Sequence, residues 1–218
     1  MRRALVLVIL LATLGTSQAT PQSIILIDRV LAESERDIPD LAMLTTEPVA
    51  RTESSGYGWR EDPINKREKF HHGTDYRGKR GTPVLAAGAG SVVFAGRRGG
   101  YGKVVFIDHG SGVITRYAHL NKIEVEVGDV VVGGNRIGQL GSTGRTTGAH
   151  LHFEVRLSGR PVDPNTALTV AALMRESPTA GRLAAYALAP AVQEQMRDPE
   201  SPSRPERRAR AKRQQVLW

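Results

Sequence analysis

The most constraining feature of this sequence is the alternation of polar and apolar residues from His150 to Val155. His150 and His152 are separated by Leu151, and Phe153 follows them. Successive side chains of a β-strand point to opposite faces, so both imidazoles would project from one face while the apolar residues pack against a core. The segment therefore predicts a strand that presents two histidines together.

A second pair of chemically capable residues lies earlier in the chain. His71 and Asp75 form an H-x-x-x-D pattern, and Gly73 between them would let the backbone turn tightly enough to aim both side chains at one point. With the two later histidines this makes three or four nitrogen and oxygen donors. Two histidines and a carboxylate are a common ligand set in hydrolytic zinc sites, which keep one position for water. A lone histidine is more often structural, but two patterned pairs in one short domain predict a metal site.

Further motifs occur in a fixed order around these pairs. They are G-Y-G-W-R-E-D-P at 56–63, F-H-H-G-T-D at 70–75, G-T-P-V at 81–84, Y-A-H-L at 117–120, G-S-T-G at 141–144 and H-L-H-F-E at 150–154. Together they resemble the LytM/lysostaphin-type zinc metallopeptidases over residues 53–166. The resemblance implies a compact all-β domain of the duplicated hybrid motif type.

The resemblance also implies roles for five residues. Zinc (Zn²⁺) would be bound by His71, Asp75 and His152, and the catalytic histidines His119 and His150 would flank the metal-bound water. Those two are the candidates for the general base and for the oxyanion or leaving-group donor, with the assignment between them open.

Glu154 lies on the same strand face as His150 and His152, and two interpretations of it stay open. Its carboxylate either orients a ligand imidazole or belongs to the surface.

The Gly-rich segment 96–103 is expected to be a flexible loop beside the cleft.

Short runs rich in Val, Ile and aromatic residues, separated by Gly, Asn and Asp turns, predict an all-β barrel or sandwich over residues 53–168. The expected strands are 84–86, 91–95, 103–108, 113–119, 123–127, 136–140 and 151–157. On the run that ends at His119, simple alternation places Val113, Thr115, Tyr117 and His119 on one face, with His119 at a strand end where a cleft can form.

The N-terminal region predicts export. Residues 1–19 combine Arg2 and Arg3, a short apolar run and small residues at the two positions that a signal peptidase inspects. The apolar run is shorter than the roughly 20 residues of a membrane span, which favours a cleaved signal peptide over a retained anchor. The expected location is the periplasm or cell envelope, with secretion as a further option. Residues 20–52 are interpreted as a linker or a pro-like segment that holds the site closed.

Residues 169–218 are expected to form a partly helical or disordered tail, Ala-rich at first and basic at its end. Export favours an anionic envelope surface over nucleic acid as a partner for this basic end, and a simple solvated end is the alternative.

For the whole chain, the family resemblance implies an exported zinc endopeptidase that cleaves peptidoglycan peptide cross-links. The alternative function is a non-catalytic peptidoglycan-binding or hydrolase-activating protein, and neither a glycine bridge nor a direct D-amino-acid cross-link is selected.

Overall fold

The computed structural model describes residues 38–50 and 52–189 of the chain. The predicted signal peptide at 1–19 and the basic end beyond residue 197 lie outside the described residues. No helix within the described ranges is long and apolar enough to cross a membrane.

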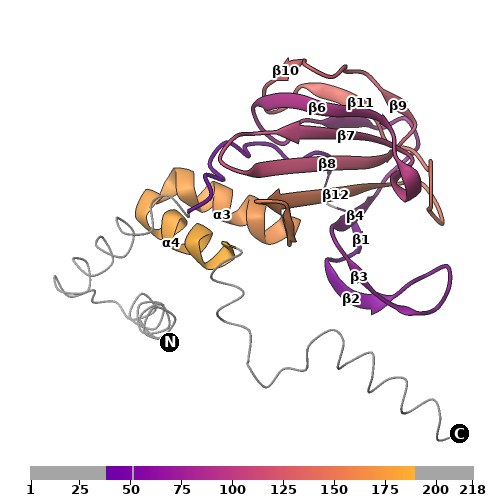
Figure 1. Ribbon diagram of the computed structural model, residues 1–218, viewed down its shortest axis with the longest axis horizontal. Coiled ribbons are helices and arrows are strands. Elements are labelled where there is room, and N and C mark those ends of the chain that lie inside the picture. The colour runs from indigo at the N-terminus through magenta and orange to yellow at the C-terminus, as the bar shows by residue number, and fades with distance from the viewer. Residues whose placement is uncertain (1–37, 51, 190–218) are drawn as a thin grey trace, which may run out of the picture.

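An eight-stranded antiparallel sheet forms the body of the domain (Figure 1). In sheet order its strands are β1 (Glu53–Ser55), β4 (Thr74–Arg77), β12 (His150–Leu157), β8 (Val113–Leu120), β7 (Lys103–Asp108), β6 (Gly90–Arg97) and β10 (Val130–Val131), with β13 (Arg160–Val162) paired to the far end of β12. The sequence prediction of an all-β fold is confirmed.

Two smaller sheets complete the strand architecture. One is β5 (Pro83–Leu85), β11 (Arg136–Gln139) and β9 (Lys122–Ile123), and the other is the hairpin of β2 (Gly58–Glu61) and β3 (Glu68–His71). The hairpin projects from the side of the domain that carries β1 and β4 (Figure 1).

The main core lies on one face of the large sheet, where it includes residues of the three-stranded sheet. Phe153 and Leu151 of β12, Tyr117 of β8, and Val84 and Ile137 of the smaller sheet are all fully buried in it. These residues occupy alternate positions of their strands, so the opposite face of the large sheet remains available for polar side chains. That face carries the candidate site.

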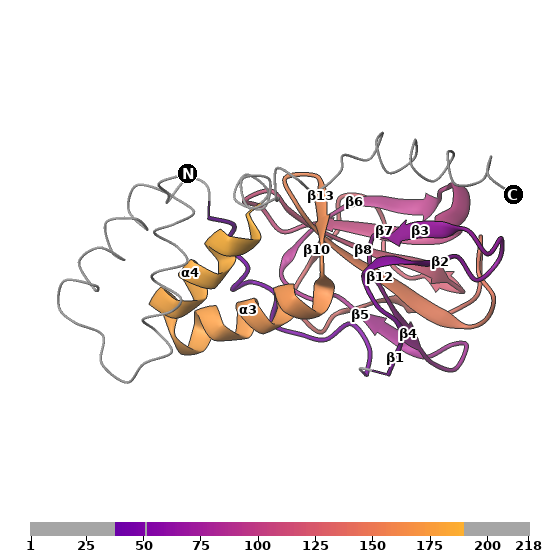
Figure 2. The ribbon, with the colours of Figure 1, turned by 90° about the horizontal axis from the view of Figure 1, so that it is seen from below.

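Two helices extend the packed unit beyond the strands. Helix α3 (Pro164–Glu176) is capped at its N-terminus by Asp163, whose carboxylate accepts a hydrogen bond from the backbone N–H of Asn165 at 3.1 Å. It is followed by α4 (Pro178–Leu188), and the two lie side by side at one end of the sheet, away from the hairpin (Figure 2). Ala167, Leu168 and Val170 of α3 belong to the core.

Three boundaries differ from the sequence expectations. Leu41 and Leu44, in the segment interpreted as a linker, are buried in the core, so packing begins before residue 53. Helix α3 begins before residue 169 and is held by the core through its apolar side chains. The strand expected at 123–127 ends at Ile123, and Val127 is 64% exposed because it lies in the turn that leads to β10.

Candidate metal centre

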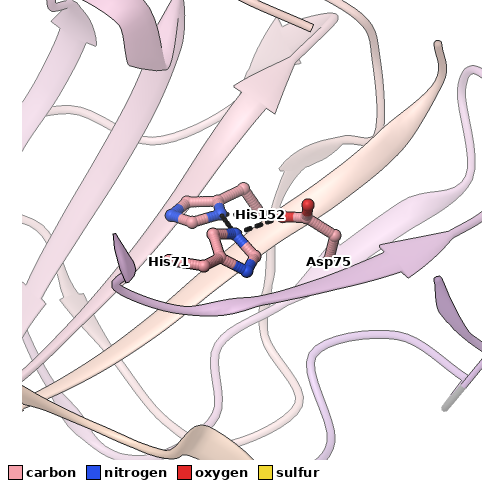
Figure 3. A group of neighbouring side chains, drawn as sticks. All are labelled: His71, Asp75 and His152. Atoms are coloured by element: carbon pink, nitrogen blue, oxygen red, sulfur yellow. Dashed lines mark hydrogen bonds and ion pairs between the residues drawn. The ribbon is translucent and has the colours of Figure 1, made fainter. Parts of the chain in front are cut away.

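Three side chains converge on one point of the polar sheet face (Figure 3). Asp75 Oδ1 lies 2.8 Å from His152 Nδ1 and 3.1 Å from His71 Nε2, and the two nitrogens are 3.0 Å apart. All three residues are about nine-tenths buried. The structure thus brings together the three residues that the sequence predicted as metal ligands.

Strand pairing places two of these ligands. Asp75 of β4 and His152 of β12 are direct cross-strand partners, so their side chains stand side by side on the same face. His71 arrives from the end of β3. Gly73, between β3 and β4, passes so close to β12 that a Cβ there would lie 2.3 Å from the Phe153 carbonyl oxygen. Glycine is therefore required for close approach to β12 at this position.

Each ligand histidine has its second ring nitrogen engaged by an oxygen. His71 Nδ1 donates to the Gly56 carbonyl at 2.7 Å, which leaves Nε2 to face the other ligands. His152 Nε2 donates to Glu154 Oε1 at 3.1 Å, which leaves Nδ1 at the centre. Hydrogen bonds of this kind hold a metal-binding imidazole in the required tautomer and orientation.

The donor set fits zinc. Ligand bonds of about 2.0–2.2 Å in a tetrahedron separate neighbouring donors by about 3.4 Å, so the three atoms need only small outward shifts. Two imidazoles and one carboxylate leave a coordination position for water, as hydrolytic zinc sites do.

The two predicted catalytic histidines lie against this centre. The ring centroid of His119 is 4.8 Å from that of His150 and 5.8 Å from that of His152. His119 Nδ1 donates to the Thr143 carbonyl at 2.8 Å. His150 Nδ1 is 2.9 Å from the Gly148 carbonyl, and its Nε2 lies 3.7 Å from Asp75 Oδ1.

His119 lies on the face of β8 opposite to the one that simple alternation predicts. Lys103 pairs with Leu120 and Val105 with Tyr117, so one residue of β7 faces two residues of β8, Ala118 and His119. This β-bulge, together with the left-handed backbone of His119 at φ 61°, reverses the alternation. The expectation that His119 shares a face with Tyr117 is wrong, because Tyr117 is buried in the core while His119 lines the cavity.

Glu154 is the anchor of a buried network behind His152. Only 1% of the residue is exposed, and besides His152 it accepts hydrogen bonds from Tyr101 Oη at 2.7 Å and Arg156 Nε at 2.7 Å. Arg116 Nη1 lies 3.5 Å from Oε2 of Glu154, the oxygen that Arg156 also bonds. The structure thus supports the orienting interpretation of Glu154 and excludes the surface interpretation.

Burial and hydrogen bonds set the protonation of the metal-free site. Burial opposes ionisation of Asp75, but hydrogen bonds from His152 and His71 outweigh it and hold the pKa of Asp75 far below its ordinary value. Burial favours neutral His152, yet the hydrogen bonds to Asp75 and Glu154 raise its pKa to about 9. Burial lowers the pKa of His119 to about 4, so this imidazole is neutral at pH 7.

A cavity of about 340 Å³ opens over these groups. The sequence indicated no role for several of its lining residues, among them Arg60, Asp62, Tyr101 and Arg145. Tyr101 belongs to a 3₁₀ turn, Gly99–Tyr101, inside the segment expected to be a flexible loop. Arg60 and Asp62 lie within the motif at 56–63, so that motif is the sequence feature from which their place in the site could have been predicted.

The sequence also contains His72, next to His71, and His109, in the D-H-G turn at 108–110, and for both it favours a structural role. His109 is buried and bonds the Ala89 carbonyl through Nδ1 at 2.6 Å and Thr115 Oγ1 through Nε2 at 2.7 Å, which confirms that expectation. His72 is exposed and contributes no atom to the three-ligand cluster, although it lines the cavity rim.

Fold and site together define a metallopeptidase-type β domain with a His₂Asp metal centre. Residues 69–164 match the model of peptidase family M23. The chain therefore carries a family M23 domain, and the resemblance to LytM/lysostaphin-type zinc peptidases is confirmed.

Individual relatives agree with this assignment. The chain is 45% identical over 133 residues to the DD-carboxypeptidase/endopeptidase Mpg of Neisseria meningitidis, covering 61% of this chain and 31% of that protein. It is 48% identical over 101 residues to the peptidoglycan DD-endopeptidase ShyA of Vibrio cholerae, covering 46% and 24%. A crystal structure of a zinc-containing peptidase from Vibrio cholerae is similar with a TM-score of 0.51 at 38% identity, covering 58% of this chain and 39% of that one. The chain thus spans less than a third of the length of Mpg and of ShyA.

Proposed function

We propose that this protein is a zinc metalloendopeptidase that hydrolyses peptide cross-links of bacterial peptidoglycan. The observation that carries the proposal is the placement of two further imidazoles, His119 and His150, against the convergent donors of His71, Asp75 and His152. A site that only stored or displayed a metal would not need two additional proton-handling groups beside it. The name of the relative ShyA, a peptidoglycan DD-endopeptidase, supports peptidoglycan as the substrate.

Zinc held by the three ligands would supply a nucleophilic hydroxide near neutral pH and polarise the scissile carbonyl. The remaining chemistry belongs to side chains of this protein. Because His119 is neutral at pH 7 and its Nδ1–H is held by Thr143, its Nε2 is an acceptor for the proton of the attacking water. We assign the acceptor role to His119 on this basis.

His150 suits the complementary role. Its Nδ1 is held by the Gly148 carbonyl, which directs Nε2 toward the centre near Asp75. When both of its ring nitrogens carry a proton, Nε2 can donate a hydrogen bond to the oxyanion or give its proton to the leaving amine. Glu154 and Tyr101 stay behind His152 and keep its ring fixed during these proton movements.

We further propose that the bond cleaved joins D-amino acids, because one relative is named a DD-carboxypeptidase/endopeptidase and the other a DD-endopeptidase. The test is digestion of purified cross-linked muropeptides, in parallel with a pentaglycine-bridged substrate, with mass analysis of the products. Zinc-dependent cleavage of the direct cross-link alone is the expected result. No cleavage of either substrate by fully zinc-loaded protein would support the non-catalytic alternative.

Export to the envelope is also part of the proposal, motivated by the signal-like residues 1–19 and by a substrate that lies outside the cytoplasm. The basic end would then add affinity for anionic envelope surfaces. N-terminal sequencing of protein from fractionated cells tests export, since a mature chain that begins after residue 19 is expected. Deletion of residues 204–218 tests the basic end and should reduce low-salt binding to sacculi without changing cleavage of a small muropeptide.

A further inference from the structure

Arg60 holds an unusual position at the edge of the metal centre. It lies on β2, pairs with Lys69 of β3 and lines the cavity. Its Nη2 is 3.5 Å from Asp75 Oδ2, the carboxylate oxygen turned away from the two ligand histidines. A guanidinium is therefore placed beside the reaction centre on the wall that the hairpin forms.

The donors of Arg60 are poorly satisfied. Its Nε is buried and has no hydrogen-bond partner among the described residues, and Nη1 makes only a long contact of 3.4 Å to the Glu61 carbonyl. A guanidinium offers five N–H donors in a planar fork. A buried donor without a partner is unfavourable, so the guanidinium of Arg60 retains donor capacity that no described protein acceptor fills.

Two other cations line the cavity, and both face the carboxylate of Asp62. Arg145 forms an ion pair with Asp62 at 2.7 Å, and Lys69 lies 4.0 Å from the same carboxylate. Glu154 is held by Arg156 at 2.7 Å. The carboxylate nearest Arg60 is Asp75, whose Oδ1 is committed to the histidine ligands. Arg60 is therefore the least exposed of the three cavity cations, and the one that contacts a predicted metal ligand.

We propose that Arg60 binds a carboxylate of the substrate peptide next to the scissile amide, which makes the site selective for anionic peptides. This inference rests on the proposed peptidase function and specifies its substrate class. A guanidinium fork binds carboxylates through two parallel hydrogen bonds, which would position the peptide as well as attract it. The carboxylate comes either from the chain terminus or from an acidic side chain beside the cleaved bond.

The test uses three matched cross-linked peptides with the same scissile bond. One has both carboxylates free, one has only its chain terminus amidated, and one has only its side-chain carboxylate amidated. For wild-type enzyme, kcat/KM should be lower on one of the two amidated peptides than on the free acid by on the order of 10²-fold, mainly through a higher KM. The amidated group of that peptide is then the carboxylate that Arg60 binds. Equal kcat/KM on all three peptides would overturn the proposal.

Arg60→Gln should lose the same factor on the free acid and no longer discriminate among the three peptides. Arg67→Gln is the matched control, because it removes the same charge from the same hairpin at a residue that does not line the cavity, and it should behave as wild type. An equal loss for Arg60→Gln on all three peptides would instead make Arg60 a positioning residue for Asp75 and overturn the proposal. If Arg60→Gln does not fold, Arg60→Lys takes its place in the test. Lys keeps the positive charge but lacks the planar fork of donors, so Arg60→Lys should discriminate among the three peptides less strongly than wild type.

A binding measurement separates this inference from the proposed function. Calorimetry with zinc-loaded protein and a non-hydrolysable analogue should show the same preference for the free carboxylate, lost in Arg60→Gln. If wild-type protein cleaves no peptide but keeps this preference, the peptidase proposal fails and carboxylate binding by Arg60 stands. If it cleaves all peptides without preference, the peptidase proposal stands and the role of Arg60 fails.

Discussion

The carboxylate of Glu154 accepts a hydrogen bond from Nε2 of His152 at 3.1 Å, on the side of the imidazole opposite the metal centre. Because Glu154 also receives hydrogen bonds from Tyr101 and Arg156, its own position is fixed by buried partners. The orientation of one predicted zinc ligand is thus set by residues that do not touch the metal.

The first prediction follows from this relationship. Glu154→Gln should weaken zinc affinity by about 10- to 100-fold, because it removes the negative charge that holds the His152 tautomer. Competition with a chromophoric chelator measures the change. Glu124→Gln is the control, since Glu124 is also ion-paired, with Arg136 at 2.6 Å, but does not line the cavity. Equal affinity of the two variants would contradict the role given to Glu154.

The second prediction concerns the ligands themselves. His152→Ala should remove most bound zinc, because His71 and Asp75 alone provide only two of the three converging donors. Elemental analysis of purified protein measures the zinc content. His72→Ala, a change of the histidine next to His71 that contributes no donor to the cluster, should retain zinc. Full occupancy in His152→Ala would show that the metal is bound elsewhere.

The third prediction separates catalysis from metal binding. His119→Ala and His150→Ala should keep zinc yet lose activity on the order of 10²- to 10⁴-fold, the usual cost of losing a positioned acid or base. Hydrolysis of a cross-linked muropeptide and zinc content are measured on the same preparation. Wild-type activity in either variant would remove that residue from the mechanism.

The fourth prediction is that zinc binding releases a proton. In the metal-free site the pKa of His152 is raised to about 9, so Nδ1 carries a proton at pH 7.5 that the metal must displace. Apparent zinc affinity should therefore fall by up to about tenfold for each pH unit below 9. Calorimetry in two buffers of different ionisation enthalpy should report about one proton released per zinc. A binding enthalpy independent of the buffer would contradict this protonation state.

The fifth prediction uses His109, which lies in the core away from the metal. Burial lowers its pKa from the ordinary value of 6.5, so below pH 6.5 the unfolded chain binds a proton that the folded protein resists. Stability should fall as the pH drops from 6.5 until the lowered pKa of the folded state is reached. The melting temperature of wild type should therefore decline more steeply from pH 6.5 to 5 than that of His109→Gln. Parallel declines would show that His109 does not contribute.

Much of the strand framework could be predicted because strand patterns are local. The runs 103–108 and 151–157 appear as β7 and β12 with almost the expected bounds. The first is a continuous run of Val, Phe and Ile, the second alternates apolar with polar residues, and a turn containing Gly follows each. The short strands β1, β10 and β13 lack such a pattern. They are strands because neighbouring strands offer free backbone groups to pair with, which a reading of local sequence does not detect.

The sequence by itself determined that His150, His152 and Glu154 share one face of a strand, because the two-residue period of a strand follows from its backbone geometry alone. Only the tertiary structure decided how His119 joins them. Its direction depends on the bulge that forms where β8 pairs with β7, and on a left-handed backbone that those contacts stabilise. The positions of Tyr101 and Arg60 at the same cavity were likewise decided by the folding of a turn and a hairpin against the sheet, because these contacts join residues that are distant in the sequence.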